Sequence, residues 1–147
     1  MYDSGIGGLS VLNELKKTLP NEDYVYFADT ANMPYGNKSR DQIINYSRKI
    51  ILFFQNEIKA KLVVAACHTS SAVALENIAH EFYTPIIGTI NPIMKHMKSG
   101  YKRVGVIATQ ASIESGMHKQ IISQMKNPPE VVSVACPDFV PLIERKS

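Results

Sequence analysis

The strongest constraint on the fold is a short apolar block at residues 62–66, followed by small polar residues and an amphipathic segment. The block, Leu-Val-Val-Ala-Ala, has the length of a strand and contains no breaker. A strand that is apolar on both faces is typical of the interior of a parallel sheet. Beyond it, apolar residues recur at helical spacing up to Phe82, which predicts a helix. We expect Thr69, Ser70 or Ser71 to cap the first free N–H groups of that helix.

Cys67 follows the apolar block directly and precedes the predicted helix. The partial positive charge at a helix N-terminus favours a thiolate over a thiol. Ligands of open parallel sheets also collect at the carboxyl ends of the strands. The alternative is an inert core cysteine, because free cysteines are among the most buried residues. The position and the neighbouring hydroxyl groups favour a reactive thiol.

Strands and helices alternate along the rest of the chain. Further strands are predicted at 24–27, 85–88, 103–108 and 131–135. Helices are predicted at 9–19, 39–60, 91–100 and 111–125, with a last one starting within 141–146. Ser39 followed by Gln42 is a capping-box pattern that starts the second of these helices. The alternation predicts an α/β fold, a parallel sheet with flanking helices and right-handed crossovers.

Two segments of the chain follow one plan. Residues 62–76 and 103–117 both read as an apolar strand, small residues, a threonine, a serine and an amphipathic helix. This internal echo indicates two similar lobes, although a generic strand–helix unit has the same pattern. We expect residues 1–90 to form the first lobe and 91–147 an incomplete second lobe, with the crossing between them at 88–92.

A glycine-rich turn, Asp-Ser-Gly-Ile-Gly-Gly at residues 3–8, opens the chain. Such a turn normally follows a strand, yet only Met1 and Tyr2 precede it, so we expect the first lobe to lack its usual first strand. The turn is similar to a dinucleotide-binding loop, but Ser10 replaces the third glycine, which disfavours a nucleotide site. A missing central strand leaves neighbouring backbone groups unpaired, so we expect a homodimer or another form of self-association.

Composition and charge exclude several functions. Of the 147 residues, 45% are apolar and 20% are charged, which is ordinary for a globular protein. The net charge of +3 is dispersed along the chain, so neither nucleic acid nor a membrane is expected as a partner. No apolar run reaches the roughly 18 residues of a membrane span, and no signal peptide opens the chain. Cys67 and Cys136 form no disulfide framework, so a reducing cytoplasm fits best.

The predicted strand ends bring together one thiol, one carboxylate, several hydroxyls and many backbone N–H groups. They carry Asp3 and Ser4, the loop Pro34-Tyr35-Gly36, Cys67 with Thr69, and Thr109. Such a set suits a small anionic substrate held by hydroxyls and by amides at helix N-termini. No Cys or His residues cluster at ligand spacing, so no metal is expected. The histidines on predicted helices are expected in surface or core roles rather than in catalysis: His80, His96 and His118.

Five motifs occur in register along the chain. They are residues 3–9 (Asp-Ser-Gly-Ile-Gly-Gly-Leu), 34–36 (Pro-Tyr-Gly), 66–72 (Ala-Cys-His-Thr-Ser-Ser-Ala), 107–109 (Ile-Ala-Thr) and 136–142 (Cys-Pro-Asp-Phe-Val-Pro-Leu). Together they resemble the bacterial glutamate racemases, within the cofactor-independent aspartate/glutamate racemase family. The resemblance covers the whole chain. It implies a two-lobed, pseudo-symmetric racemase fold that uses no cofactor.

The resemblance also implies a reaction, the interconversion of L- and D-glutamate for peptidoglycan by two cysteines on opposite faces of the α carbon. Inversion needs two acid/base groups, because a single group that returns its own proton restores the starting hand. By resemblance, Cys67 is one of that pair and Asp3 lies beside it. The substrate, glutamate, is expected at Ser4, Pro34, Tyr35, Gly36, His68, Thr69 and Thr109, with a supporting role for Glu144.

The chain departs from the family pattern in three ways. The partner cysteine of the family lies in a Gly-Cys-Thr-His segment that this sequence does not contain, so we expect little or no racemisation by this chain alone. Cys136 falls in a different motif and is expected to be a buried strand-end cysteine. The strand before the turn is cut to two residues, Met1 and Tyr2. His68 stands where the family usually has asparagine, and an imidazole can charge near neutral pH.

These departures leave alternatives open. One is a non-catalytic relic that still binds an amino acid or a protein partner. Another is a racemase for aspartate or another small acid, which the histidine at position 68 favours and the motifs at 3–8 and 34–36 disfavour.

Overall fold

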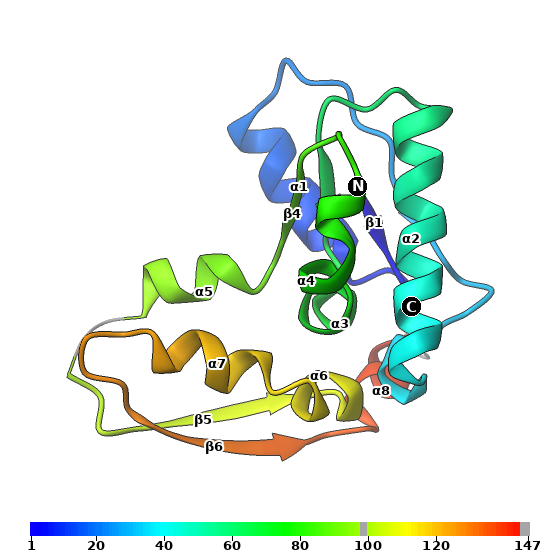
Figure 1. Cartoon of the computed structure of the whole chain (residues 1–147). Helices are drawn as coiled ribbons and strands as arrows, with labels where there is room; N and C mark the ends of the chain where they lie inside the picture. Colours follow the sequence, from blue (N-terminus) through cyan, green and yellow to red (C-terminus); the bar gives the residue numbers. More distant parts are fainter. Residues whose placement is uncertain (98–99, 145–147) are drawn as a thin grey trace.

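The chain folds into two parallel sheets with helices packed against them, as the computed structural model shows for residues 1–97 and 100–144 (Figure 1). One sheet has the strand order β2-β1-β3-β4, and the other pairs β5 with β6. Every strand pair is parallel. The predicted α/β class is therefore confirmed, whereas the division into lobes at residue 90 remains a prediction.

The strands of the first sheet are β1 (Tyr2–Asp3), β2 (Phe27–Ala28), β3 (Val63–Ala65) and β4 (Ile86–Gly88). The second sheet consists of β5 (Arg103–Ala108) and β6 (Glu130–Ala135). The helices in the first part of the chain are α1 (Gly8–Thr18), η1 (Tyr35–Asn37), α2 (Arg40–Asn56), α3 (His68–Val73), α4 (Leu75–Ile78) and η2 (Ala79–Glu81). Those that follow are α5 (Asn91–His96), α6 (Gln110–Glu114), α7 (Met117–Ser123) and α8 (Phe139–Glu144).

Tyr2 and Asp3, where the glycine-rich turn begins, form the central strand β1, although the sequence predicted a missing strand. The backbone N–H of Ala66 donates to the Tyr2 carbonyl at 2.8 Å, and that of Asp29 donates to the Asp3 carbonyl at 2.9 Å. The strand predicted at 24–27 is displaced to Phe27–Ala28. The displacement follows from the shortness of β1, which pairs only Tyr2 with Phe27 and Asp3 with Ala28.

The predicted helices are present, but two of them are broken. The helix predicted at 111–125 splits into α6 and α7 at Gly116, whose φ of +70° is left-handed and is adopted readily by glycine. The helix expected from the hydroxyl cluster to Phe82 splits into α3, α4 and η2. The predicted capping box is confirmed, with Gln42 N–H on Ser39 Oγ at 3.3 Å and Ser39 N–H on Gln42 Oε1 at 3.0 Å.

Two helix ends differ from the predictions. The helix predicted to close at Gly100 ends at His96, and residues 98–99 lie outside the described residues. The last helix starts at Phe139 rather than within 141–146. Among the described residues, no helix combines the length and the apolar character that a membrane span requires.

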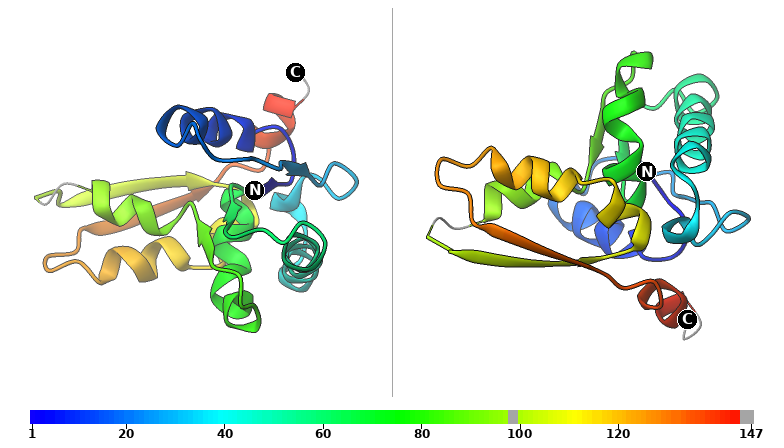
Figure 2. Two further views of the ribbon diagram at one scale, coloured as in Figure 1. Left: turned by 90° about the horizontal axis from the view of Figure 1, so that it is seen from above. Right: turned by 60° about the horizontal axis from the view of Figure 1, so that its bottom comes forward.

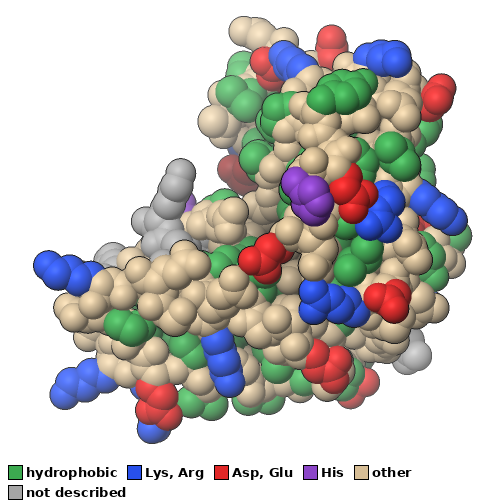
Figure 3. Space-filling model, viewed as in Figure 1, with side chains coloured by type: hydrophobic (Ala, Val, Ile, Leu, Met, Phe, Trp, Pro, Cys, Tyr) green, Lys and Arg blue, Asp and Glu red, His purple; other side chains and the backbone are tan. Residues whose placement is uncertain are grey.

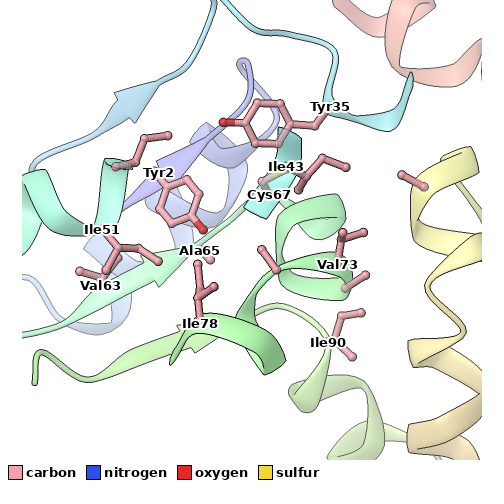
Figure 4. Close-up of a cluster of buried hydrophobic side chains, with 14 of the residues drawn as sticks. Tyr2, Tyr35, Ile43, Ile51, Val63, Ala65, Cys67, Val73, Ile78 and Ile90 are labelled. Carbon is pink, nitrogen blue, oxygen red and sulfur yellow. The ribbon is translucent and has the colours of Figure 1, made fainter. Parts of the chain in front are cut away.

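The hydrophobic core lies between the first sheet and helices α2, α3 and α4. Its largest fully buried side chains include Tyr2, Ile51, Phe54 and Ile78. Figure 4 shows Cys67 in the same cluster, at the end of the central strands. The outer surface carries basic and acidic side chains interspersed over the face drawn in Figure 3, which agrees with the dispersed charge of the sequence.

The second sheet is covered on one face only. Helices α6 and α7 lie along one face of β5 and β6, and the described helices leave the other face open (Figures 1 and 2). Strand residues alternate between half-buried and exposed, and the register aligns the exposed Ile107 with Val134 and Gly105 with Val132. Ile107 is 64% exposed. We call the exposed set Gly105, Ile107, Val132 and Val134 the open sheet face.

The core position of Ile51 generates a stability prediction. Ile51 is 0% exposed and Leu52, the next residue of α2, is 40% exposed. We expect Ile51→Ala to lower the free energy of unfolding by about 2–5 kcal/mol, because it leaves a cavity between α2 and the first sheet. Leu52→Ala is the matched control, with an expected loss below about 1 kcal/mol. Urea unfolding followed by circular dichroism measures both; equal losses would contradict this description of the core.

Candidate active site

The carboxylate of Asp3 holds the glycine-rich turn at the end of β1. Its Oδ2 accepts hydrogen bonds from the backbone N–H groups of Gly5 at 3.2 Å and Gly8 at 3.0 Å. Gly8 leaves no room for a side chain, since a Cβ there would lie 2.7 Å from Asp3 Cβ and 3.0 Å from Ala66 Cβ. The turn therefore brings a buried carboxylate against the end of β3, directly before Cys67.

Cys67 is the N-cap of helix α3. Its Sγ accepts a hydrogen bond from the Ser70 N–H at 3.4 Å and lies 3.8 Å from Ser4 Oγ. The prediction that Thr69, Ser70 or Ser71 caps this helix is wrong, because the helix begins one residue before the hydroxyl cluster. These hydroxyls do not cap the helix. Ser70 Oγ, for example, donates a hydrogen bond to the Cys67 carbonyl at 3.1 Å.

The electrostatics of Cys67 run opposite to the sequence-based expectation. The side chain is only 4% exposed, and this burial raises the pKa of the Cys67 thiol. The negative charge of Asp3 raises the pKa further, while the Ser70 N–H and Ser4 contacts lower it less. The thiol form is therefore favoured in the ligand-free chain, because desolvation of the charged sulfur outweighs the positive end of a six-residue helix.

A network of hydroxyl groups joins α3 of the first part of the chain to α6 of the second. Thr69 Oγ1 and Thr109 Oγ1 are 2.9 Å apart, and Thr109 Oγ1 lies 2.9 Å from Ser112 Oγ. Thr109 is also the N-cap of α6, since its Oγ1 accepts from the Ser112 N–H at 3.4 Å. We call Thr69, Thr109 and Ser112 the hydroxyl network. It brings two predicted substrate-binding residues into direct contact.

The Pro34-Tyr35-Gly36 loop packs against this network. A Cβ on Gly36 would lie 2.7 Å from Thr109 Cβ, so the backbone of the loop lies directly against that threonine. Tyr35 is buried, and its hydroxyl donates to Asp29 Oδ2 at 2.6 Å. Burial and the hydrogen bond to Asp29 both raise the pKa of Tyr35. The phenol thus anchors the loop to Asp29, while Pro34 precedes it as the half-buried N-cap of η1.

Glu144 reaches the turn from the far end of the described chain. Its Oε1 accepts a hydrogen bond from the Ile6 N–H at 3.2 Å, across 138 positions of sequence. The carboxylate also occupies the space beside Gly5 where a side chain would stand. The candidate with the least support in the sequence therefore lies beside Asp3-Ser4-Gly5.

His68 forms a pair with His118, a contact that the sequence did not predict. The two Nε2 atoms are 2.8 Å apart, and His68 Nδ1 lies 3.1 Å from Thr89 Oγ1. Burial lowers the pKa of His68 to about 4, with a smaller contribution from His118, and burial also lowers the pKa of His118. His118 fell among the histidines expected in surface or core roles; it is a buried side chain at the junction of α3 and α7.

Several further features were outside the reach of sequence reasoning. Asp29 and Ser112 were not singled out, although Thr109 and Ser112 have the spacing of a cap and its N3 partner. Cys136 was expected to be buried and is only half-buried. It directly follows β6, in the sheet that the described helices leave open on one face.

A groove of about 520 Å³ runs between the loop after Gly36 and helix α6, and Cys67 does not line it. Gly36, which does line it, lies against Thr109.

Comparisons with known proteins agree with the motifs. A family model described as Asp/Glu/Hydantoin racemase matches residues 7–146. The glutamate racemase of Gloeothece citriformis is 46% identical over 145 residues, which are 99% of this chain and 52% of that protein. The glutamate racemase of Aquifex aeolicus is 44% identical over 146 residues, 98% of this chain and 56% of that protein. The chain thus spans about half the length of the curated relatives it matches.

Solved structures give the same result. Glutamate racemase from Francisella tularensis in complex with D-glutamate matches with a TM-score of 0.90 and 36% identity over 98% of this chain and 54% of that chain. The enzyme from Thermus thermophilus in complex with Beta-chloro-D-alanine matches with a TM-score of 0.84 and 36% identity over 98% and 53% of the two chains. The predicted family resemblance is confirmed.

The burial of Cys67 predicts slow reaction with alkylating reagents. We expect iodoacetamide at pH 7.5 to modify the half-buried Cys136 at least tenfold faster than Cys67, because only the thiolate reacts and the Cys67 pKa is raised. The Cys67 rate should increase only as the pH passes above the ordinary thiol range. Peptide mass spectrometry over time gives both rates, with the urea-unfolded chain as control. Faster modification of Cys67 in the folded chain would contradict the described environment.

Proposed function

The chain belongs to the Asp/Glu/hydantoin racemase family, and on that premise we propose that it carries one half of the proton-transfer site of a glutamate racemase. The observation that supports this proposal is the environment of Cys67: Ser4 contacts its sulfur, the Asp3 carboxylate acts on its charge, and Thr69, two residues later on α3, meets Thr109 of α6. The thiol is the acid/base group, and the hydroxyls and turn amides are polar partners for an amino-acid substrate.

The raised pKa of Cys67 suits it to this role. A thiolate formed in this buried site, beside the Asp3 carboxylate, is a stronger base than a thiolate in water. It can therefore remove a proton from the α carbon of glutamate, and the resulting thiol can return a proton to the same face. Return to the same face restores the starting hand, so inversion requires a second group on the opposite face.

Access to Cys67 requires the packing around it to open, because the residue is only 4% exposed. We expect the opening to separate the Thr69–Thr109 contact and the packing of Gly36 on Thr109. Both contacts join the part of the chain before residue 90 to the part after it. We infer that substrate enters from the side of the groove beside Gly36, in a cytoplasmic protein that supplies D-glutamate for peptidoglycan.

A second candidate function is binding without turnover. The near-complete burial of Cys67 and the preference for its protonated form favour a module that holds D-glutamate or another small dicarboxylate and performs no chemistry. The imidazole of His68 leaves aspartate or another small acid as a further possible substrate.

Deuterium exchange separates these functions. We expect the purified chain in D₂O to exchange the α proton of D-glutamate without producing L-glutamate, because one face of the substrate meets a thiol. Cys67→Ser should slow the exchange by about a hundredfold or more, and Cys136→Ser is the matched control with an unchanged rate. Proton NMR gives the exchange and a chiral assay gives the inversion.

The outcomes of this experiment are distinct. Rapid inversion by the purified chain would contradict the half-site proposal. Binding without exchange would support the second candidate, and thermal unfolding detects it: D-glutamate at ten times its Kd stabilises the folded chain by about 1.4 kcal/mol. Failure of D-glutamate, aspartate and other small dicarboxylates to stabilise the chain would overturn both functions.

The open sheet face leads us to propose that the chain self-associates. Parallel sheets are normally covered on both faces, and an isolated pair of strands is marginally stable. The open face is apolar, and the Arg103–Glu130 ion pair at its end is neutral overall. Two copies meeting across a two-fold axis would therefore bury apolar surface without like-charge repulsion.

We expect Val134→Glu, which places a charge in the open sheet face, to weaken this association at least tenfold. Gln124→Glu adds the same charge at an exposed position after α7 and is the matched control. Sedimentation velocity over a hundredfold concentration range measures the effect. A monomeric parent chain over that whole range would overturn the proposal.

A further inference from the structure

The imidazoles of His68 and His118 belong to a chain of hydrogen bonds that crosses between the two parts of the molecule. On one side, Ser71 Oγ donates to the Ala65 carbonyl at 3.0 Å and accepts from Thr89 Oγ1 at 3.4 Å. Thr89 Oγ1 then meets His68 Nδ1 at 3.1 Å. On this side, the series of hydrogen bonds runs from the first sheet to a ring nitrogen of His68.

On the other side, His68 Nε2 meets His118 Nε2 at 2.8 Å, and the rings lie 5.0 Å apart at an angle of 34°. A hydrogen bond with the Ser112 backbone favours the protonated form of His118 and raises its pKa. The Ser112 carbonyl also accepts from Ser115 Oγ at 2.7 Å. Both ends of the chain are carbonyl oxygens, which only accept. Every hydrogen in the chain must therefore come from the two hydroxyls and the two rings.

The hydrogens can be counted. The five links between the Ala65 carbonyl and the Ser112 backbone share four hydrogens when both rings are neutral. If His68 Nδ1 donates to Thr89, His68 Nε2 accepts the single hydrogen of His118, which then has no second N–H for Ser112. If Thr89 instead donates to His68 Nδ1, the unfilled link is the long one between Thr89 Oγ1 and Ser71 Oγ at 3.4 Å, and Ser71 still accepts from the Thr89 N–H at 3.2 Å. One additional proton on the pair fills the vacant link in either arrangement.

A second additional proton does not fit. It would place N–H groups on both Nε2 atoms, which face each other at 2.8 Å, and two donors cannot bond to one another. The pair in this arrangement accommodates either no additional proton or one. Desolvation opposes the charge and leaves the ligand-free pair neutral at pH 7, as the lowered pKa of both rings indicates.

The charges that surround the pair are few. Among the described residues, the electrostatic influence on His68 beyond desolvation comes from His118. The acidic side chains on the neighbouring helices have partners of their own: Glu76 of α4 bonds Gln120, and Glu114 of α6 bonds Gln110. Three other ionisable groups lie on the same or neighbouring segments of the sequence: Cys67 directly precedes His68, His96 is on α5, and Lys119 is on α7. No carboxylate of these neighbours is bonded to either ring, so the site lacks the negative charge that would stabilise an imidazolium.

We propose that the His68–His118 pair takes up one proton from solvent when an anionic ligand binds beside Cys67, and that His118 is the positioning residue that holds His68 for this purpose. The nature of the anion rests on the proposed function; the sharing of one proton by the pair does not. A ligand carboxylate next to α3 supplies the missing negative charge. Binding is then tighter at lower pH, up to tenfold per pH unit where one full proton is taken up.

The sharing of one proton is tested without ligand. Nitrogen-15 NMR of the ring nitrogens between pH 3 and 8 should show His68 and His118 responding at one common midpoint, with one proton gained by the pair. In His118→Asn, His68 should titrate alone at a shifted midpoint. His96→Asn, at an exposed position of α5, is the matched control and should leave the common midpoint unchanged. Independent titration of the two rings in the parent chain would overturn the proposal, whether or not the variant folds.

The coupling to an anion is tested with D-glutamate. Calorimetric titrations at pH 6.5 are run in phosphate and in imidazole buffer, which have different enthalpies of ionisation. The binding heats in the two buffers should differ by that enthalpy difference multiplied by the number of protons taken up, at most one per ligand bound. His118→Asn should abolish the difference. Binding with equal heats in both buffers would overturn the coupling and leave the proposed function intact. Absence of D-glutamate binding, with a common midpoint by NMR, would contradict the proposed function while supporting the shared proton.

Discussion

The central strand β1 is the constraint on which the rest of the structure depends. Its two residues supply the pairing for β2 on one side and β3 on the other, and the Asp3 carboxylate folds the next turn back onto the strand end. Tyr2 and Asp3 each have more than one structural role. The Tyr2 side chain fills the core at 0% exposure, and the Asp3 backbone and side chain fix the sheet and the turn.

The same constraint determines the chemistry of Cys67. Because β1 is adjacent to β3, Ser4 contacts Cys67, two residues after the end of β3, and the charge of Asp3 acts on its thiol. A carboxylate beside a buried thiol makes the thiolate costly, and a costly thiolate is a strong base once it forms. Burial therefore slows the reaction of Cys67 with general reagents. It also makes the Cys67 thiolate a stronger base toward a substrate that brings its own positive charge, such as the ammonium group of an amino acid.

The sequence predicted the elements that local patterns determine. The apolar block at 62–66 became β3, Ser39 and Gln42 formed their capping box, and the five motifs identified the family. The contacts that define the candidate site were less accessible because they join distant positions: Ile6 with Glu144 across 138 residues, and His68 with His118 across 50. The family resemblance indicated a supporting role for Glu144 but not its contact with Ile6. Nothing in the pattern around His118 indicated the second, since a histidine on a short helix has many possible neighbours. Cys67 as a helix cap was missed for a different reason: the hydroxyls that follow it are the usual capping residues.

The two halves of the candidate site are joined by contacts that can separate. The hydroxyl network and the histidine pair are hydrogen bonds between neutral groups in the ligand-free chain, and each such bond contributes only about 1 kcal/mol net. Most of the apolar core lies on one side of this junction, under α2 and α4, and Ala111 of α6 and Ile121 of α7 extend it to the other side. Opening at Thr69–Thr109 and His68–His118 therefore leaves the first sheet and its helices intact, and the polar groups released at the junction become the groups that a charged amino acid can bind. The opening also separates the apolar side chains of Ala111 and Ile121 from the core cluster to which they belong, and this loss of burial adds to the free energy that a bound amino acid must supply.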